Sequence, residues 1–346
     1  MAGGQGTRLR PLTLLKPKPM VTLLGRPVID FIGKALHNAG VSELIVTTGY
    51  RGDQLIEKTQ SWSQHFGIPS RVNQESTPMG TAGSVRLLSE EITSTCVIGS
   101  GDSVASYDIR PLLECHRTSG AKVTMALWDV NNPTEYGIVG LSSTHDGELQ
   151  SNLSEGYIRK FAEKPKLEDA FSTLINAGLY VIEPEVIDLI PADTKYDFSK
   201  DLFPRLLEMN WPMYAKKVEG LWFDVGHPEE LLKAQSALLS SPRYLPFSLP
   251  EGTRYGDTCY SVSPVQEGQV ERCYIDEDCN IHPSSFIKDS YIMRSSVIEQ
   301  DVTIINSIIG EGCTIQSNTL VENCIIGDGT VIAPHCRYVD QRIPSE

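Results

Sequence analysis

Several features that would place a protein in a class at once are missing from this sequence. The longest apolar runs, such as ELIVTT at 43–48, have the length of a strand and fall far short of the ~20 residues of a membrane helix. No apolar segment of a secretory signal follows Met1. The eight cysteines contain no CxxC pair, which is the usual spacing of a zinc site. We therefore expect a cytoplasmic protein without a membrane segment and without a zinc site.

The charge of the chain restricts its partners. The net charge is −14, which argues against binding of nucleic acid by the surface as a whole. Residues 1–34 differ from the rest, because they hold six cationic side chains and a single acid, Asp30. A basic, glycine-rich segment on an acidic protein favours a small anionic ligand over a polyanion.

The order of apolar stretches predicts an α/β fold. Between about 20 and 130, strand-like segments at 43–48, 95–100 and 121–130 alternate with helical periodicity. Such alternation is typical of a Rossmann-like, mostly parallel sheet with helices on both faces. The region 135–183 reads as strands, and helices are expected near 184–190, at 199–209 and after Pro228.

The C-terminal part carries an internal repeat. Aliphatic residues recur at steps of 6, 5, 6, 6, 5, 6, 5, 6 and 6, and a small or modest side chain stands two residues before each. A three-sided parallel β-solenoid needs this period, because each short face sends one aliphatic residue inward. The predicted domains are therefore 1–240, a Pro- and Ser-rich linker at 241–264, and a solenoid at 265–346. The repeating residues are Ile281, Ile287, Ile292, Ile298, Ile304, Ile309, Ile315, Leu320, Ile326 and Ile332.

The repeat also explains most of the cysteines. Five of the eight fall on its small-residue position, where a free thiol acts as a small apolar side chain. We expect buried free thiols rather than a disulfide framework. These residues are Cys273, Cys279, Cys313, Cys324 and Cys336.

The N-terminal stretch AGGQGTRLRPLTLLKPKPM has the composition of a phosphate-binding loop. It matches neither GxxxxGK[ST] nor GxGxxG, since Leu9 stands where the third glycine would be. Its glycines let backbone N–H groups approach phosphate oxygens, and Thr7 adds a hydroxyl. Arg8 and Lys18 supply charge at two separated points, and the prolines around Lys18 restrict its backbone.

Seven motifs stand in the first 240 residues. They are GGQGTRLRPLT…PKPM at 3–20, PMGTAGS at 78–84, GSGD at 99–102, EYG at 135–137, FAEKP at 161–165, INAG at 175–178 and WFDVGHPEE at 222–230. Alone, each has a plainer interpretation: Asp102 is typical of a turn, and Lys164 of a solvated surface charge. Together and in this order, they resemble the sugar-1-phosphate nucleotidyltransferases, in which a C-terminal left-handed β-helix is common.

The resemblance implies a reaction in which a sugar phosphate oxygen attacks the α-phosphorus of a nucleoside triphosphate and expels pyrophosphate. Positioning and charge neutralisation would carry the rate. It implies catalytic roles for Arg8, Lys18 and Lys164, and a shared Mg²⁺ on Asp102 and Asp224. It assigns sugar contacts to Gly137, Glu163 and Asn176. It assigns nucleotide contacts to Gly3, Gly4, Gly6, Thr7, Glu75, Gly80 and Thr81.

The base and the sugar are less determined. Glu75 stands at the family's base-reading position, and a carboxylate accepts from both N1–H and N2–H₂ of guanine. A shift by one residue would place Gln74 there and favour a pyrimidine. Guanine implies mannose 1-phosphate by family association. Two alternatives stay open, a glucose-1-phosphate uridylyl- or thymidylyltransferase and a non-catalytic subunit that binds nucleotide sugar.

Two departures from the family pattern matter. Members have an apolar strand before the glycines, so we expect the natural start to lie upstream of Met1. Acyltransferase members use a basic residue in the β-helix, and neither His282 nor His335 has an evident partner in the sequence. The tail is therefore expected to be structural and to form a homo-oligomer.

Overall fold

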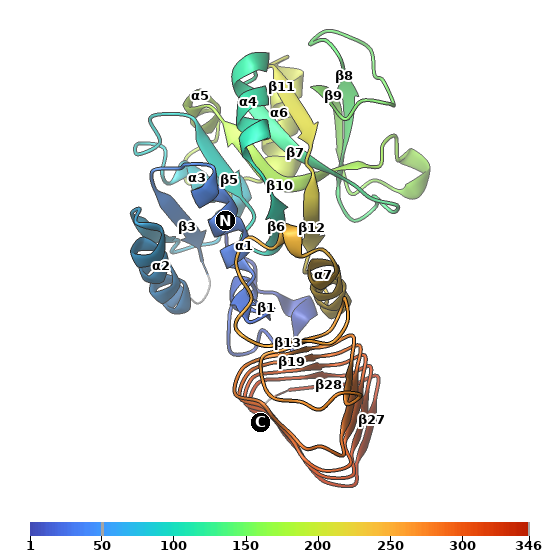
Figure 1. Cartoon of the computed structure of the whole chain (residues 1–346). Coiled ribbons are helices and arrows are strands. Elements are labelled where there is room, and N and C mark those ends of the chain that lie inside the picture. The colour runs from blue at the N-terminus through green and yellow to red at the C-terminus, as the bar shows by residue number, and fades with distance from the viewer. Residues whose placement is uncertain (50–51, 345–346) are drawn as a thin grey trace. The chain divides into compact units, whose positions relative to one another are not determined.

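In the computed structural model, which describes residues 1–49 and 52–344, the chain forms two compact units (Figure 1). The first unit comprises residues 1–3, 32–101 and 107–222, and the second comprises residues 4–31, 102–106 and 223–346. The glycine-rich loop thus belongs to the same unit as the solenoid. This division differs from the boundary at 240 that the sequence predicts.

The first unit is built on β-sheets. β3 and β4 pair in parallel, and a second sheet has the order β5-β10-β7-β11-β9-β8. Met1 and Ala2 bond to both, because the Met1 ammonium donates to Gly99 O and Ala2 N donates to Thr47 O. The strands are β3 (Leu44–Thr48), β4 (Ser70–Gln74), β5 (Cys96–Gly99), β7 (Val123–Asp129), β8 (Gly137–Ser142), β9 (Glu155–Glu163), β10 (Leu174–Ile182) and β11 (Met213–Lys217).

The predicted α/β architecture is confirmed, although in the six-stranded sheet β7–β11 is the one parallel pair among the described strands. β7 and β11 pair in parallel, whereas β10 runs antiparallel to both β5 and β7. A parallel pair needs a crossover of a dozen or more residues, usually a helix. The chain from β8 to β10 contains no α-helix in the described structure, so these strands enter antiparallel.

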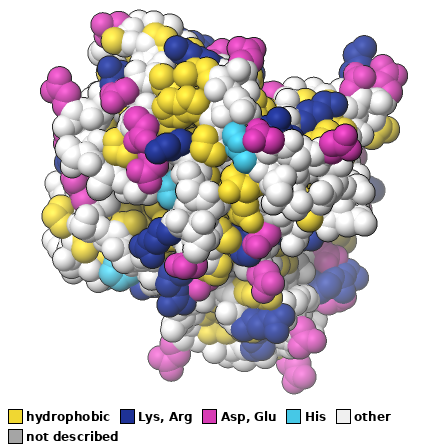
Figure 2. Space-filling view, turned by 90° about the horizontal axis from the view of Figure 1, so that it is seen from above, with side chains coloured by type: hydrophobic (Ala, Val, Ile, Leu, Met, Phe, Trp, Pro, Cys, Tyr) yellow, Lys and Arg dark blue, Asp and Glu magenta, His cyan; other side chains and the backbone are white. Residues whose placement is uncertain are grey.

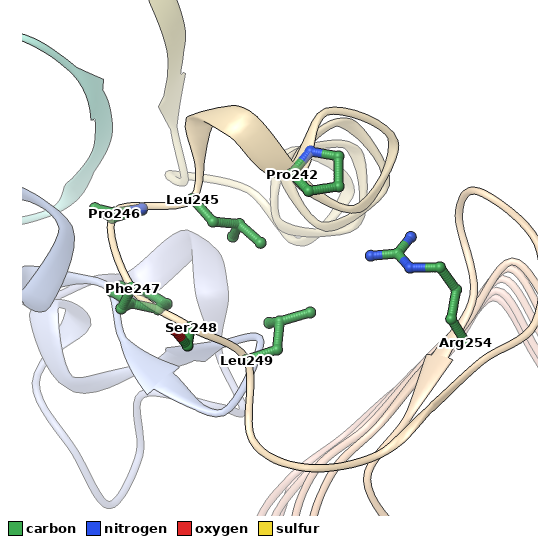
Figure 3. A pocket seen from close by; sticks show the side chains of 7 residues that line it. All are labelled: Pro242, Leu245, Pro246, Phe247, Ser248, Leu249 and Arg254. Carbon is green, nitrogen blue, oxygen red and sulfur yellow. The ribbon is translucent and has the colours of Figure 1, made fainter.

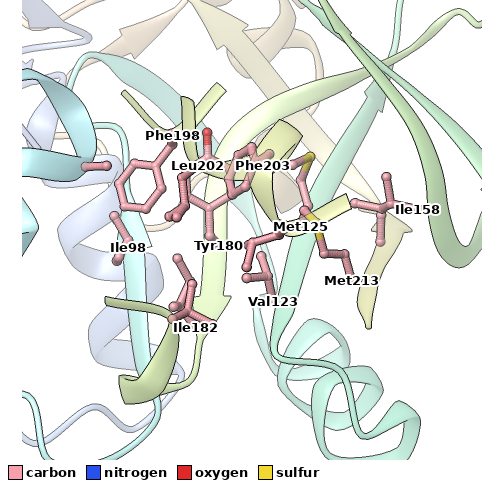
Figure 4. Close-up of a cluster of buried hydrophobic side chains, with 14 of the residues drawn as sticks. Ile98, Val123, Met125, Ile158, Tyr180, Ile182, Phe198, Leu202, Phe203 and Met213 are labelled. Carbon is pink, nitrogen blue, oxygen red and sulfur yellow. The ribbon is translucent and has the colours of Figure 1, made fainter. Parts of the chain in front are cut away.

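The helices of this unit pack on its sheets and contribute side chains to its hydrophobic core. α4 packs on β7 and β11, and α6 packs on β9. Phe198 and Phe203 meet Tyr180 in the core cluster of Figure 4, and each large buried side chain contributes about 1.5–3 kcal/mol. No helix in the described ranges is long and apolar enough to cross a membrane. The helices are α1 (Ile29–Asn38), α2 (Gly52–Phe66), α3 (Gly80–Arg86), α4 (Arg110–Ser119), α5 (Pro184–Asp188), η3 (Leu167–Asp169), the π-helix η4 (Phe198–Leu202) and α6 (Phe203–Glu208).

The second unit begins with the glycine-rich loop and a short hairpin. Its helix α7 starts at Pro228, where a proline costs no helical hydrogen bond, and buries Leu231 and Leu238. The elements outside the solenoid are η1 (Thr7–Leu9), η2 (Lys18–Met20), β1 (Thr22–Leu23), β2 (Arg26–Pro27), α7 (Pro228–Ser240) and η5 (Pro242–Tyr244). The paired strands β6 (Ser103–Tyr107) and β12 (Gly220–Asp224) each have residues in both units.

The segment predicted as a linker is packed within the second unit. Phe247 contacts the Phe31 ring edge-on and lies beneath the Arg26 guanidinium. Leu245, Leu249 and neighbouring residues border an open groove of about 490 Å³ (Figure 3). These side-chain contacts therefore hold the segment in place, although its sequence has no hydrophobic period that would predict them.

Residues beyond the linker form a parallel β-solenoid, as the repeat predicts. Its coils stack into three sheets of 7, 5 and 4 strands, and the ladder already includes β14 inside the predicted linker. The strands are β13 (Thr253–Arg254), β14 (Tyr260–Ser261), β15 (Val270–Glu271), β16 (Tyr274–Ile275), β17 (Asn280–Ile281), β18 (Phe286–Lys288), β19 (Tyr291–Ile292), β20 (Val297–Ile298), β21 (Thr303–Ile305), β22 (Ile308–Ile309), β23 (Thr314–Ile315), β24 (Leu320–Glu322), β25 (Ile325–Ile326), β26 (Val331–Ile332), β27 (Arg337–Val339) and β28 (Arg342–Ile343).

The structure corrects one residue of the repeat. Val321, not Leu320, is the inward residue of its face: Val321 is fully buried and stacks on Ile304. With Val321 in place, the steps follow 6, 5 and 6 without interruption. The small buried residue before it is accordingly Thr319 rather than Asn318.

The cysteines of the solenoid behave as small apolar side chains. All eight cysteines of the chain are free, and four of the five on the repeat are buried in the solenoid core. Burial raises the pKa of the Cys313 thiol to about 12 and that of Cys279 to about 11. Cys336 is only half-buried.

Candidate functional site

The glycine-rich loop folds around Gly6. This residue has a φ of +62°, and a Cβ there would lie 2.8 Å from the Cβ of Lys18 and 2.9 Å from the Cγ2 of Thr13. Its carbonyl accepts from the Thr13 hydroxyl at 2.8 Å and from Leu9 N at 3.0 Å. Glycine at position 6 therefore lets the loop close directly against Lys18.

Lys18 lies between two carboxylates. Its Nζ donates to Asp102 Oδ2 at 2.8 Å and to Asp224 Oδ1 at 3.2 Å, and the residue is buried. Burial by itself would lower the pKa of the ammonium, but the Asp102 and Asp224 charges outweigh it and raise the pKa above its usual value. The three motifs that supply these residues are thus brought together within the second unit.

The same two carboxylates fit a divalent cation. Oxygens of Asp102 and Asp224 converge on one ammonium, which shows that both reach a single cationic group. Within residues 1–49 and 52–344, no group of three or more His, Cys, Asp and Glu side chains could hold a metal. Mg²⁺ needs no such group, because one or two carboxylates plus substrate phosphates are its common ligands. The pair thus offers a divalent cation two oxygen ligands.

Arg8 and Thr7 project from the exposed part of the loop. Arg8 Nη1 lies 3.4 Å from Nε2 of His227, a residue of the WFDVGHPEE motif that sequence reasoning did not single out. A Cβ at Gly4 would stand 4.0 Å from Asp102 Oδ2, so this glycine faces the acidic pair. An anion bound along the loop would meet Arg8 and the loop amides.

In the first unit, Glu75 follows β4 directly. Its N–H donates to Thr48 O at 2.8 Å, and its Oε2 accepts from Met79 N at 3.1 Å. The carboxylate therefore holds the chain that leads into α3. One of its about four acceptor positions is used in this way.

Gly80 and Thr81 begin α3 and dock on the segment 196–200. Gly80 has a φ of +77°, and a Cβ there would come within 2.6 Å of Tyr196 O. The Thr81 hydroxyl donates to Asp197 Oδ2 at 2.8 Å and accepts from Phe198 N at 3.0 Å. The Thr81 hydroxyl is thus hydrogen-bonded to other groups of the protein, and these bonds position the start of α3.

Glu163 closes over Gly137 at the adjoining ends of β9 and β8. A Cβ at Gly137 would lie 2.6 Å from Cζ of Phe161 and 2.7 Å from Glu163 Oε2, so a larger residue there would have to displace the ring and the carboxylate. Burial raises the pKa of Glu163, while Lys164 and Lys200 oppose that rise. Lys164 has a φ of +48°, an unusual conformation for a lysine, and its N–H donates to Tyr136 O. The strand end thus presents a carboxylate with two cations nearby.

Asn176 shapes a bulge in β10. Its Nδ2 donates to the Tyr180 hydroxyl at 2.8 Å and to Ser199 Oγ at 3.3 Å, and its Oδ1 accepts from Gly178 N. Both amide protons are thereby used within the protein. The expected sugar contact would have to come from its oxygen.

The predicted residues form two groups, one in each unit. The second unit joins Gly4, Gly6, Arg8, Lys18, Asp102 and Asp224, and the first joins Gly80, Thr81, Gly137, Glu163, Lys164 and Asn176. Sequence reasoning missed the segment Asp197–Lys200, which connects the members of the first-unit group. This segment lies at the start of the helix predicted at 199–209, but no family motif includes it.

Comparison with known families gives two matches. The nucleotidyl transferase family matches residues 1–241. A family described as the GMPPB C-terminal domain matches residues 269–343.

The curated relatives agree on the class of enzyme. The chain is 34% identical over 244 residues to the mannose-1-phosphate guanyltransferase of Saccharomyces cerevisiae and 36% identical over 245 residues to that of Debaryomyces hansenii. It is 33% identical over 254 residues to a UTP–glucose-1-phosphate uridylyltransferase of Synechocystis. These matches cover 69–70% of the chain but only 62–64% of each relative. On the match over residues 1–241, the chain belongs to the nucleotidyl transferase family.

Proposed function

We propose that this chain condenses a nucleoside triphosphate with a sugar 1-phosphate, and that its preferred substrates are GTP and mannose 1-phosphate. The observation that carries the proposal is the Lys18 ammonium between Asp102 and Asp224, beside the glycine-rich loop. Two relatives bear the name of mannose-1-phosphate guanyltransferase, which supports this choice of substrates.

The reaction needs no protein nucleophile. A phosphate oxygen of the sugar 1-phosphate attacks the α-phosphorus and forms the new P–O bond. The bond from the α-phosphorus to the bridging oxygen breaks, and pyrophosphate leaves with that electron pair. Arg8 and Lys18 hold the triphosphate and balance its charge, and Lys164 holds the sugar phosphate. When bound at Asp102 and Asp224, Mg²⁺ would supply further neutralisation of the phosphate charge.

Glu75 is the proposed reader of the base. Guanine presents two donors on one edge, and the carboxylate retains acceptor positions beside the bond from Met79 N. Uracil or thymine would set a carbonyl oxygen against the carboxylate, at a cost of about 1–3 kcal/mol for each unpaired group. Guanine is therefore the preferred base.

A uridylyl- or thymidylyltransferase acting on glucose 1-phosphate is the second candidate. Gln74 directly precedes Glu75 and its Oε1 lies 3.2 Å from the place of a Cβ at Gly52, so an amide is available near the same strand end. The Synechocystis relative also bears the name of a uridylyltransferase. The base preference of a variant with Glu75 replaced distinguishes the two candidate functions.

The partners that we propose are these small anions and further copies of the chain. On the face shown in Figure 2, basic side chains lie among acidic ones rather than forming one cationic field. Such a surface suits a bound phosphate ligand more than a nucleic acid. A cytoplasmic location and assembly through the solenoid remain proposals.

The test is pyrophosphate release across five nucleoside triphosphates and four sugar 1-phosphates with Mg²⁺. We expect release with GTP and mannose 1-phosphate, and its loss in Asp102→Asn and Asp224→Asn. Asp146→Asn is the matched control, because the Asp146 side chain is 79% exposed and pairs with His145, which belongs to neither group.

The alternatives give different results. Release with UTP or dTTP alone would retain the reaction and overturn the role of Glu75. Glu75→Gln should move the preference toward a pyrimidine if Glu75 reads the base. No release with any pair, from a folded protein, would favour the non-catalytic nucleotide-sugar-binding subunit.

A further inference from the structure

The solenoid contacts the glycine-rich loop through an ion pair whose side chains are largely buried. Lys16 Nζ lies 2.6 Å from Glu311 Oε1 and 2.9 Å from Asp328 Oδ2. The side chains are only 11%, 21% and 12% exposed. Exposed ion pairs add little to stability, whereas a buried pair is costly to break because it leaves a charge without compensation.

The two acids belong to successive coils of the solenoid. Glu311 and Asp328 are one repeat of 17 residues apart, and Glu311 N donates to Asp328 Oδ1 at 3.0 Å. Arg294, one repeat earlier, donates to the other oxygen of Glu311 at 3.1 Å. The stacking of coils therefore builds the receptor for Lys16 and fixes the direction of both carboxylates.

A second contact, made by hydrogen bonds from the solenoid, holds the main chain of the same loop at Arg8 and Arg10. Arg342, on the strand β28, donates from Nη1 to Arg8 O at 2.6 Å and to Arg10 O at 3.3 Å. The main chain of Arg8 is thus held by the solenoid, while its side chain reaches toward His227. Fixing this carbonyl restricts the directions in which the Arg8 guanidinium projects.

The two contacts lie next to residues that are to bind phosphate. Arg342 holds the chain at Arg8, and Lys16 anchors it two residues before Lys18. Pro17 is extended, with ψ 153°, so neighbouring side chains leave the backbone in different directions. Lys16 accordingly meets Glu311 and Asp328, and Lys18 meets Asp102 and Asp224.

We propose that the solenoid is a positioning element for the reaction: Lys16 with Glu311 and Asp328, and Arg342 with two loop carbonyls, hold the triphosphate-binding loop in its productive shape. The inference rests on the proposed function, in which this loop binds the nucleoside triphosphate. It gives the solenoid a part in nucleotide binding besides the structural one that the sequence predicts.

The principal test compares Lys16→Met with Lys16→Arg and Lys288→Met. Arginine can bridge both carboxylates, and Lys288 pairs with Glu271 elsewhere on the solenoid, so its loss is a matched control. For Lys16→Met we expect KM for GTP to rise about tenfold and kcat/KM to fall about ten- to a hundredfold, because small displacements of a binding group are costly. KM for mannose 1-phosphate should stay unchanged, and Lys16→Arg should recover most of the loss.

A second readout does not depend on activity. Backbone amides of Leu9, Arg10, Leu12 and Leu14 donate to carbonyls within the loop, so their hydrogen exchange reports its shape. Exchange of residues 4–18 should quicken in Lys16→Met and not in Lys288→Met. A wild type that transfers no nucleotide, together with faster hydrogen exchange of residues 4–18 in Lys16→Met, would overturn the proposed function. That result would still support the role of the ion pair in holding the loop.

Other outcomes would overturn the inference. Equal exchange and equal kcat/KM in Lys16→Met and Lys288→Met would show that the ion pair has no positioning effect. Faster exchange with unchanged KM for GTP would show that the loop's shape does not matter to binding. If Lys16→Met does not fold, Arg342→Met decides by the same measurements, since Arg342 is exposed and its removal buries no charge.

Discussion

Replacing Gly6 by alanine tests the close packing of the loop against Lys18. An L-residue at φ +62° carries a cost of about 1–2 kcal/mol. The new Cβ would also lie 2.8 Å from the Cβ of Lys18 and 2.9 Å from Thr13 Cγ2, an overlap that costs about 1–3 kcal/mol when packed neighbours must shift. We expect Gly6→Ala to lower the free energy of unfolding by about 2–5 kcal/mol. A displaced Lys18 should lower kcat/KM about ten- to a hundredfold.

Gly120→Ala is the matched control for this change. Gly120 has a φ of +65° and nothing within 4 Å of its Cβ position, so alanine there brings the backbone cost without the overlap. Urea unfolding and pyrophosphate release would be measured on both variants. Equal losses of stability in the two variants, together with unchanged kcat/KM in Gly6→Ala, would refute the packing of the loop against Lys18.

Thr81, Asp276 and Cys313 provide three further tests. Thr81→Val should lower the free energy of unfolding by about 1–2 kcal/mol, because Asp197 and Phe198 N each lose a hydrogen-bond partner, and Thr81→Ser should restore the stability in urea unfolding. Burial raises the pKa of Asp276 to about 6, so the folded state holds its proton more tightly and stability is lost as the pH rises from about 4 to about 6. Asp276→Asn should remove up to about 3 kcal/mol of that fall, as measured by urea unfolding at each pH, and an unchanged pH profile would contradict it. Cys313 should resist alkylation in the folded protein and react on unfolding, as mass spectrometry of labelled peptides can show.

The solenoid could be predicted almost completely from spacing. A period of 17 residues fixes which side chains meet in successive coils, so one aliphatic residue for each face is enough to identify the fold. The exception, Leu320 for Val321, arises because two aliphatic residues stand side by side and either satisfies a step of five or six. The 17-residue period itself selects Val321, which stands 17 residues after Ile304 and pairs with it in the structure.

The site could be predicted to the level of motifs. Lys18, Asp102 and Asp224, which the resemblance names, lie together in the structure, and their roles stay predictions. The hydrogen bond from Thr81 to Asp197 could not be predicted, because the two residues are 116 positions apart and no local pattern links them. The same holds for the bond between Asn176 and Ser199, which are 23 positions apart. A motif names a residue without saying which of its atoms the fold already uses.

The grouping of residues 4–31 with the solenoid lay beyond sequence reasoning for a related reason. Lys16 and Glu311 are 295 residues apart, and neither is unusual in its local context. Charge counting identifies residues 1–34 as basic but not which acids they meet. Long-range ion pairs of this kind are set by the packing of elements rather than by any local pattern.

The most direct test of the account is to follow the α-phosphorus of GTP. With α-labelled GTP, mannose 1-phosphate and Mg²⁺, the account predicts that the label moves into a nucleotide sugar in the wild type and in Asp146→Asn, but not in Asp102→Asn. Label that stays in GTP in the folded wild type, or transfer that survives in Asp102→Asn at the wild-type rate, would contradict it.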